Sequence, residues 1–215
     1  RSSGKKTKWS AKLYYMGYKD QLVLTGELDN VGAPIRQNVG NSYRLGIEAE
    51  VSIALSSQLL WQPNLSLSRN KNRSFSFQRD GQVQNLGDTN ISYSPSIIGG
   101  SNLVYAPSTQ FQIGLLSKYV GEQYLGNIDA DLSKLAAYFI NDLNIRYAIG
   151  ALGWVKAIDF SLLINNVFNS VVETNGYFFT YDDSWSVPNQ TTTIEGVGYY
   201  PQAGINFLLG ASFTF

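Results

Sequence analysis

Apolar and polar residues alternate along most of the chain, and this alternation is the clearest pattern in the sequence. Between residues 42 and 53, every large apolar side chain stands at an odd position, whereas Arg44, Glu48 and Glu50 stand at even positions. In a β-strand, a period of two places these charges on one face and the apolar side chains on the other. The pattern returns in residues 108–120 and 203–215, which predicts an all-β protein.

Eight alternating segments are predicted to form antiparallel strands. Each is long enough to cross a membrane, which takes about 9–11 residues in a tilted β-strand. The segments cover residues 8–22, 40–55, 58–69, 94–106, 108–120, 134–149, 153–168 and 203–215.

The connections between these segments alternate between short and long. The short ones lie near Ser56–Ser57, Ala106–Pro107 and Gly150–Gly153, and the long ones cover about 23–39, 70–93, 121–133 and 169–202. Short turns at one end and long loops at the other are typical of an outer-membrane β-barrel, whose long loops lie outside the cell. We therefore expect the odd-numbered apolar residues of 40–55 and 203–215 to face lipid, and the even-numbered polar residues to face the lumen.

Two segments fit this pattern less simply. After Asp131, which could cap a helix, apolar residues up to Leu143 also recur at helical spacing, so helix and strand are equally favoured there. Pro63 lies within a predicted strand, where we expect a bulge or the loss of a ladder hydrogen bond.

A soluble antiparallel sandwich would show the same alternation. Aromatic residues near the ends of the predicted strands favour the barrel, because such residues form girdles at membrane interfaces. These residues are Tyr43, Trp61, Tyr105, Tyr119, Tyr147 and Trp154.

The composition narrows the chemistry. Sixteen basic and sixteen acidic residues leave no net charge to attract nucleic acid. The chain has no cysteine and no histidine, so it lacks thiolate ligands, disulfides and the commonest general base and metal ligand. We therefore expect no enzyme activity, no cofactor and no metal site. No run of twenty apolar residues indicates a transmembrane helix.

The C-terminal stretch of the chain resembles a known family. Residues 160–169, Phe-Ser-Leu-Leu-Ile-Asn-Asn-Val-Phe-Asn, are similar to the penultimate strand of TonB-dependent outer-membrane receptors, where an Asn-Leu-Phe-Asn type of sequence recurs. Residues 203–215 resemble the last strand of that family, including its terminal aromatic residue. Segments starting at Tyr14, Asn41 and Tyr119 are also similar to receptor barrel segments.

This resemblance implies a fold and a function. Such receptors close 22 strands around a plug domain, so residues 1–215 would be the C-terminal part of the barrel, about its last eight strands, without the plug. The implied function is active import of a scarce solute (an iron chelate, cobalamin, a glycan or a peptide) across the outer membrane of a Gram-negative bacterium. The implied partners are the lipid bilayer, the plug and remaining strands, the TonB complex, the barrel-assembly machinery, the solute and, as a further candidate, a surface lipoprotein.

A self-contained eight-stranded barrel with a structural or adhesive role is the alternative. It would require a hydrogen-bond ladder between residues 8–22 and 203–215. Small residues at the predicted lumenal positions, such as Gly46, Gly114 and Gly210, suit a wide interior better than a narrow packed one.

Three sets of residues are candidates for function. Charged residues on the predicted lumenal face would contact the plug or the solute, or would form a paired, solvated patch: Arg44, Glu48, Glu50, Lys118, Asp142, Arg146 and Asp159. Residues of the loop 169–202 would bind ligand or pack the loop: Tyr177, Phe178, Phe179, Tyr181, Asp182, Asp183 and Trp185. Gly210, Phe213 and Phe215 resemble the C-terminal signal for barrel assembly. Asp129 and Asp131 start a calcium-like pattern, but Lys134 and Ile140 replace its essential glycine and glutamate.

Overall fold

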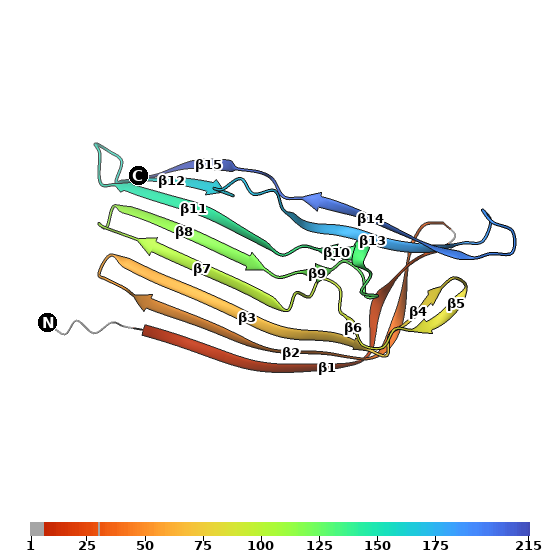
Figure 1. The fold of residues 1–215 in the computed structure, drawn as a ribbon. Helices are drawn as coiled ribbons and strands as arrows, with labels where there is room; N and C mark the ends of the chain where they lie inside the picture. Colours follow the sequence, from red (N-terminus) through yellow and green to blue (C-terminus); the bar gives the residue numbers. More distant parts are fainter. Residues whose placement is uncertain (1–6, 30) are drawn as a thin grey trace.

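Eight long antiparallel strands form the main sheet of the computed structural model, which describes residues 7–29 and 31–215 (Figure 1). Each strand pairs with the next long strand along the chain, which confirms the predicted topology. The strands are β1 (Thr7–Leu28), β2 (Pro34–Ala54), β3 (Leu59–Arg73), β7 (Ile97–Tyr105), β8 (Phe111–Val120), β11 (Tyr138–Ile149), β12 (Ala157–Asn165) and β15 (Asn206–Thr214).

Short elements fill the long connections. They are β4 (Ser76–Arg79), β5 (Gln82–Asn85), β6 (Thr89–Asn90), β9 (Gln123–Tyr124), the 3₁₀ turn η1 (Asp131–Ser133), β10 (Lys134–Leu135), β13 (Glu173–Asp183) and β14 (Thr192–Pro201). Figure 1 shows the three short turns at one end of the sheet and the long connections at the other, as predicted. Among the described residues, no helix is long and apolar enough to cross a membrane.

One expectation about the connections is wrong, and one question that the sequence left open, helix or strand after Asp131, is decided. Residues 23–39 are mostly strand, because β1 and β2 continue beyond the other strands to a tight turn in which Asp29 accepts hydrogen bonds from the backbone of Val31 and Ala33. The helical spacing after Asp131 yields only the three-residue turn η1. From Tyr138 onward the chain pairs with β8 over ten positions, and this ladder overrides the local helical preference.

The two faces of the sheet differ in chemistry. Lys12 lies opposite Glu48 on one face, whereas Leu13 lies opposite Ile47 and Ile47 opposite Leu67 on the other. We call these the charged face and the apolar face. In β15 the odd-numbered residues belong to the apolar face, since Phe207 pairs with Ile164. The odd-numbered apolar residues of both strands therefore lie on one face, as predicted, and the assignment of that face to lipid stays a prediction.

In the β1–β2 ribbon, the residues that are buried change from even to odd numbers near Asp20 and Gly40. Asp20 adopts a left-handed backbone with φ 54°, and Asp20 and Gly40 are the one unpaired position between Lys19–Asn41 and Gln21–Val39. Beyond this point odd-numbered residues become buried. They include Val23 and Val39, which form a core with Phe75, Phe77 and Ile128. Beyond Asp20, the β1–β2 ribbon therefore contributes odd-numbered residues to a small apolar core among the loops.

The ladder between β2 and β3 is interrupted at Pro63. The strands pair at Ile53–Trp61 and again at Glu50–Asn64, while the two positions between them are unpaired. The register is the same on both sides. Of the two outcomes expected at Pro63, the structure therefore shows the loss of ladder hydrogen bonds and not a bulge.

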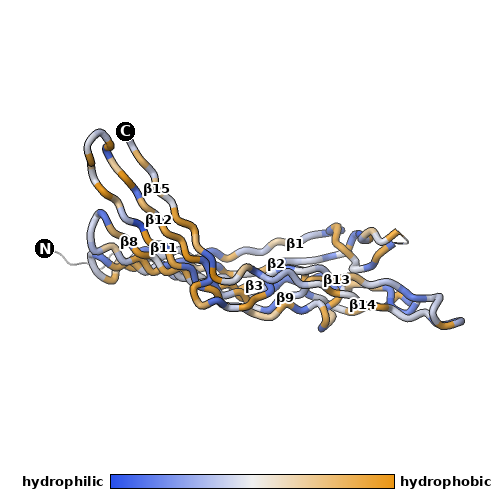
Figure 2. The backbone as a smooth tube through the Cα atoms, turned by 90° about the horizontal axis from the view of Figure 1, so that it is seen from above, coloured by the Kyte–Doolittle hydropathy of each residue, from blue (hydrophilic) through white to orange (hydrophobic). Residues whose placement is uncertain are grey.

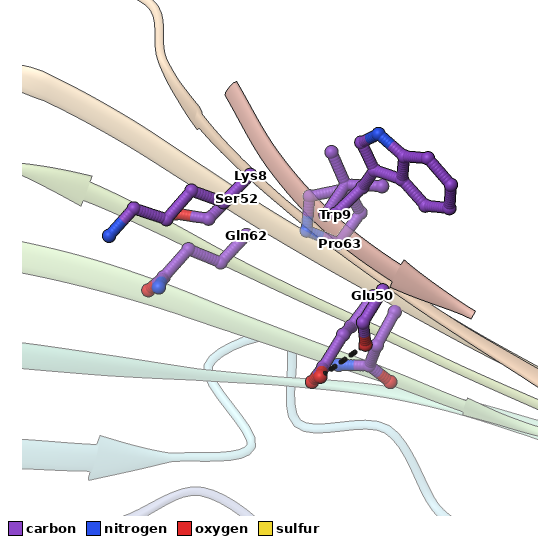
Figure 3. A pocket seen from close by; sticks show the side chains of 9 residues that line it. Lys8, Trp9, Glu50, Ser52, Gln62 and Pro63 are labelled. Carbon is purple, nitrogen blue, oxygen red and sulfur yellow. Dashed lines mark hydrogen bonds between the residues drawn. The ribbon is translucent and has the colours of Figure 1, made fainter. Parts of the chain in front are cut away.

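A depression of about 290 Å³ marks this interruption (Figure 3). Lys8 and Gln62 point away from Trp9 and Pro63 in this view, in agreement with their opposite parity. Because residues of both faces line it, the depression is a local gap between strands rather than a ligand pocket on one face.

The sheet is curved and open (Figure 2). Within the described residues, β1 and β15 form opposite edges of the long-stranded sheet and do not pair with each other. The hydrogen-bond ladder required by a self-contained eight-stranded barrel is therefore missing, and that alternative is wrong. Among the described residues, the outer edge of β1 has one bridge, a parallel pair between Glu27 of β1 and Thr180 of β13 in the β13–β14 hairpin.

Gly46 and Gly114 provide a matched test of packing on the charged face. A Cβ on Gly46 would lie 2.5 Å from Tyr14 Oη and 2.7 Å from the Leu67 carbonyl, whereas a Cβ on Gly114 would have no atom closer than 3.7 Å. We expect Gly46→Ala to destabilise the folded protein by about 1–3 kcal/mol through overpacking. Gly114→Ala should stay within about 0.5 kcal/mol of the parent. Thermal unfolding in detergent, followed by gel mobility, would measure both; equal midpoints would contradict the packing.

Candidate solute-binding site

The charged residues of β1 and β2 line a shallow groove of about 690 Å³ below the loops. Arg44 donates through Nη1 to Ser94 Oγ at 2.8 Å and to Asn70 Oδ1 at 3.5 Å, which anchors the segment after β6 to the sheet. Glu48 is exposed within the groove, and Glu50, just outside it, accepts a hydrogen bond from Ser10 at 2.7 Å. Arg44 is thus partly committed to structure, while Glu48 remains available to a partner.

The other charged-face candidates lie on β8, β11 and β12. Arg146 and Asp159 form an ion pair of 2.9 Å, as expected for a paired, solvated patch. Asp142 accepts a hydrogen bond from the backbone N–H of Asn166 at 2.8 Å and so holds the start of the last long loop. Lys118 is exposed. The structure distributes these residues along the sheet and does not bring them together with Arg44 into one cluster.

The aromatic loop candidates belong to the β13–β14 hairpin, whose two faces have different surroundings. Phe178 lies on the face that packs against the apolar core of the loops. Thr180 on the same face is fully buried. Tyr177, Phe179 and Tyr181 alternate with them and lie on the opposite face. We call the two sides the packed face and the open face.

Polar contacts fasten the packed face to the β4–β5 hairpin. Arg79 and Glu195 form an ion pair of 2.6 Å. Asp182 accepts hydrogen bonds from Thr193 Oγ1 at 2.7 Å and from the backbone N–H of Gly81 at 3.0 Å. The backbone N–H of Asp80 donates to Thr193 Oγ1 at 2.7 Å. Asp182 therefore joins two hairpins, and this structural role differs from the ligand-binding role considered from the sequence.

Flat rows of rings cover the open face. The rings of Tyr177 and Phe179 stack with centroids 6.2 Å apart and planes at 15°, and Tyr181 and Trp185 stack at 6.0 Å and 8°. Asp183 accepts hydrogen bonds from the backbone of Trp185 and Ser186, closing the turn of the hairpin. Hydrogen bonding by Ser186, through its side chain and its backbone, lowers the pKa of Asp183, so this carboxylate is ionised and engaged by the turn.

Buried asparagines hold the loops to the sheet. Asn72 and Asn127 are almost fully buried. Asn127 donates to the Leu24 carbonyl at 2.9 Å and accepts from the Ser92 backbone at 2.9 Å and from Asn72 Nδ2 at 3.3 Å. One side chain thus connects β1, β3 and two long loops.

Two neighbouring loop residues strengthen this framework. Asp129 accepts two hydrogen bonds from Asn90, at 2.8 and 2.9 Å. This acid, which begins the calcium-like pattern in the sequence, thus has a structural role in the loops. Tyr93 donates to the Gly176 carbonyl at 2.5 Å, and burial raises its pKa, so the phenol stays a neutral donor. Among the residues the structure covers, no group of three or more acidic side chains could hold a metal ion.

Comparison with known proteins identifies the family to which this chain belongs. The sequence matches a family model described as TonB dependent receptor-like, beta-barrel, over residues 2–169. This chain belongs to the TonB-dependent receptor-like β-barrel family. No curated protein matches its sequence.

Solved structures of TonB-dependent receptors show the same fold. The copper transporter OprC superposes with a TM-score of 0.66 at 17% identity, covering 97% of this chain and 29% of that chain. The siderophore receptor PiuA from Acinetobacter baumannii gives 0.64 at 15% identity, covering 97% and 26%. The ferric-catecholate import receptor Fiu from E. coli K12, in its closed form, gives 0.60 at 16%, covering 98% and 25%. This chain therefore spans roughly a quarter of the length of these structures.

The C-terminal residues of this TonB-dependent barrel segment have clear positions. Phe213 lies on the apolar face opposite Ile158, and Gly210 lies opposite Ser161 on the charged face. The Phe215 ring stacks on Trp154 with centroids 4.9 Å apart, which joins the last residue to the β11–β12 turn. Their role as an assembly signal stays a prediction.

The residues that organise the loops were not among the sequence candidates. Asn72, Asn127, Arg79 and Glu195 act through contacts between distant segments, and asparagine is common in surface loops, so no local pattern distinguishes them. The abundance of Asn in the long connections is the one signal that could have pointed to Asn127.

Asn127→Ala tests the loop framework. The substitution would leave the Leu24 carbonyl and the Ser92 N–H without partners, at about 1–3 kcal/mol for each buried group. We expect faster proteolysis of the loops at 70–93 and 121–133 in the complete receptor on whole cells. Asn144→Ala, at an exposed position on the charged face, is the matched control. Equal cleavage rates in the two variants would refute the role of Asn127.

Proposed function

We propose that this chain is the C-terminal barrel portion of an outer-membrane active transporter that imports a scarce solute with energy supplied through TonB. One observation carries the proposal: an open, curved sheet with one apolar and one charged face, in a chain that belongs to the TonB-dependent receptor family. Open edges are not tolerated in hydrocarbon. The sheet therefore requires further strands, and a plug domain would occupy the wide lumen that they enclose.

The arrangement of the connections supports the direction of transport. The long loops gather at one end of the sheet (Figure 1), and in outer-membrane barrels this end faces the outside. The loops would capture the solute there, and the charged face would line its path beside the plug. No covalent chemistry is required, and we propose no catalytic role. The TonB complex and the barrel-assembly machinery are the partners that this proposal implies.

Ile47→Arg tests the membrane orientation of the sheet. Ile47 lies on the apolar face, and a cation facing lipid near mid-depth costs about 2–4 kcal/mol. We expect a sharp fall in the amount of folded receptor in the outer membrane. Ser66→Arg is the control, because Ser66 lies opposite Glu48 on the charged face and the new cation would have an acidic neighbour. Similar losses in both variants would exclude the lipid-facing assignment.

Uptake measurements test the transport function itself. Cells with and without the complete receptor would be offered cobalamin, a ferric catecholate complex and a panel of oligosaccharides. We expect at least one of these solutes to accumulate only when both the receptor and TonB are present. Receptor-dependent uptake that persists without TonB, or uptake of every solute at the same rate in both strains, would contradict the proposal.

A further inference from the structure

The open face of the β13–β14 hairpin is a surface of aromatic rings. Tyr177 lies directly across the ladder from Gly198, and Phe179 lies across from Gly196. A Cβ on either glycine would fall within 2.4 Å of the facing ring, so each ring lies flat over the backbone of a glycine. Gly196 and Gly198 therefore leave room for the rings of Phe179 and Tyr177 to lie against the backbone of the facing strand.

These rings find their stacking partners within the hairpin. Across the described residues, the rings stacked or tilted against Tyr177, Phe179 and Tyr181 are those of Trp185, Tyr200 and one another. Tyr177, Tyr200 and Trp185 are 50, 56 and 70% exposed. The packed face, in contrast, is covered by the β4–β5 hairpin and the loop core. The aromatic surface therefore turns away from the strands and loops of this chain.

The charge of the hairpin selects among possible ligands. Residues 169–202 contain the acids Glu173, Asp182, Asp183 and Glu195 and no lysine or arginine. The hairpin therefore offers no cationic side chain to an anionic metal chelate. Three of the acids already hold partners, with Asp182 and Glu195 on the packed face and Asp183 in the turn. A cationic ligand would therefore find little free carboxylate beside the rings.

We propose that this open face is a stacking platform for the pyranose rings of a neutral oligosaccharide, which is then the class of solute that the receptor imports. The negative π faces of aromatic rings attract weakly positive C–H groups, and one side of a pyranose ring presents such groups in a flat array. A neutral sugar also needs no cationic side chain, whereas an anionic chelate would find none on this hairpin. The inference rests on the transport function proposed above.

Binding to the complete receptor in detergent tests this proposal. The probes are maltohexaose, xylohexaose and mannohexaose, with the anionic ferric complex of 2,3-dihydroxybenzoate as the opposing class. We expect at least one hexasaccharide to bind and the ferric complex not to bind. Tyr177→Ala should weaken saccharide binding roughly tenfold or more, and Tyr177→Phe should retain it. Gly198→Ala should weaken it as well, because the added methyl group displaces the Tyr177 ring.

Tyr147→Ala is the matched control, since Tyr147 is a similarly exposed tyrosine on the apolar face at the opposite end of the sheet. It should bind saccharide like the parent, and heat-dependent gel mobility would verify that every variant is folded. The proposal is overturned if no hexasaccharide binds, if Tyr177→Ala binds as tightly as the parent, or if the ferric complex binds in a Tyr177-dependent manner. TonB-dependent uptake of a solute other than a saccharide would overturn this inference alone and leave the transport function standing.

Discussion

Unpaired backbone groups along β1 and β15 impose the main physical constraint on this sheet. Each of the six inner long strands has a neighbour on both sides, but these two lack a long-strand partner on their outer edges within the described residues. In hydrocarbon, every unsatisfied N–H or C=O group costs several kcal/mol. The sheet is curved, has one charged and one apolar face, and matches roughly a quarter of the length of larger receptors. These features are consistent with a sheet whose edges pair with further strands.

The loops obey a different rule from the strands. The sheet is held by a regular ladder, and its side chains need only alternate between the two faces. The loops instead depend on a few specific contacts: a small apolar core around Phe75 and Phe77, the buried pair Asn72 and Asn127, and the ion pair between Arg79 and Glu195. Exchange of one apolar side chain for another on the exposed apolar face alters one position, whereas loss of Asn127 would release several segments at once.

The strands could be predicted because they depend on a pattern among neighbouring residues, and the loop contacts could not because they join residues far apart in the sequence. The period of two in residues 42–53 identifies both the strand and its faces, because each residue's position depends only on its neighbours in sequence. Arg79 and Glu195 lie far apart in the chain, so their contact exists only after the hairpins dock. The left-handed backbone of Asp20 was equally invisible, since Asp adopts this conformation at modest cost and carries no distinctive pattern. The aromatic residues of the last long loop were found as candidates, but their division between two faces required the ladder of the hairpin.

The bridge between Thr180 and Glu27 has a mechanical consequence. An open, curved sheet can widen unless a segment connects its two edges. The eight long strands form such a sheet. The β13–β14 hairpin lies between β12 and β15 in the chain, and its strand β13 reaches β1 at the opposite edge. The hairpin therefore links β1 to the side of the sheet that ends in β15, and it does so at the loop end, whereas the described residues form no such link at the turn end.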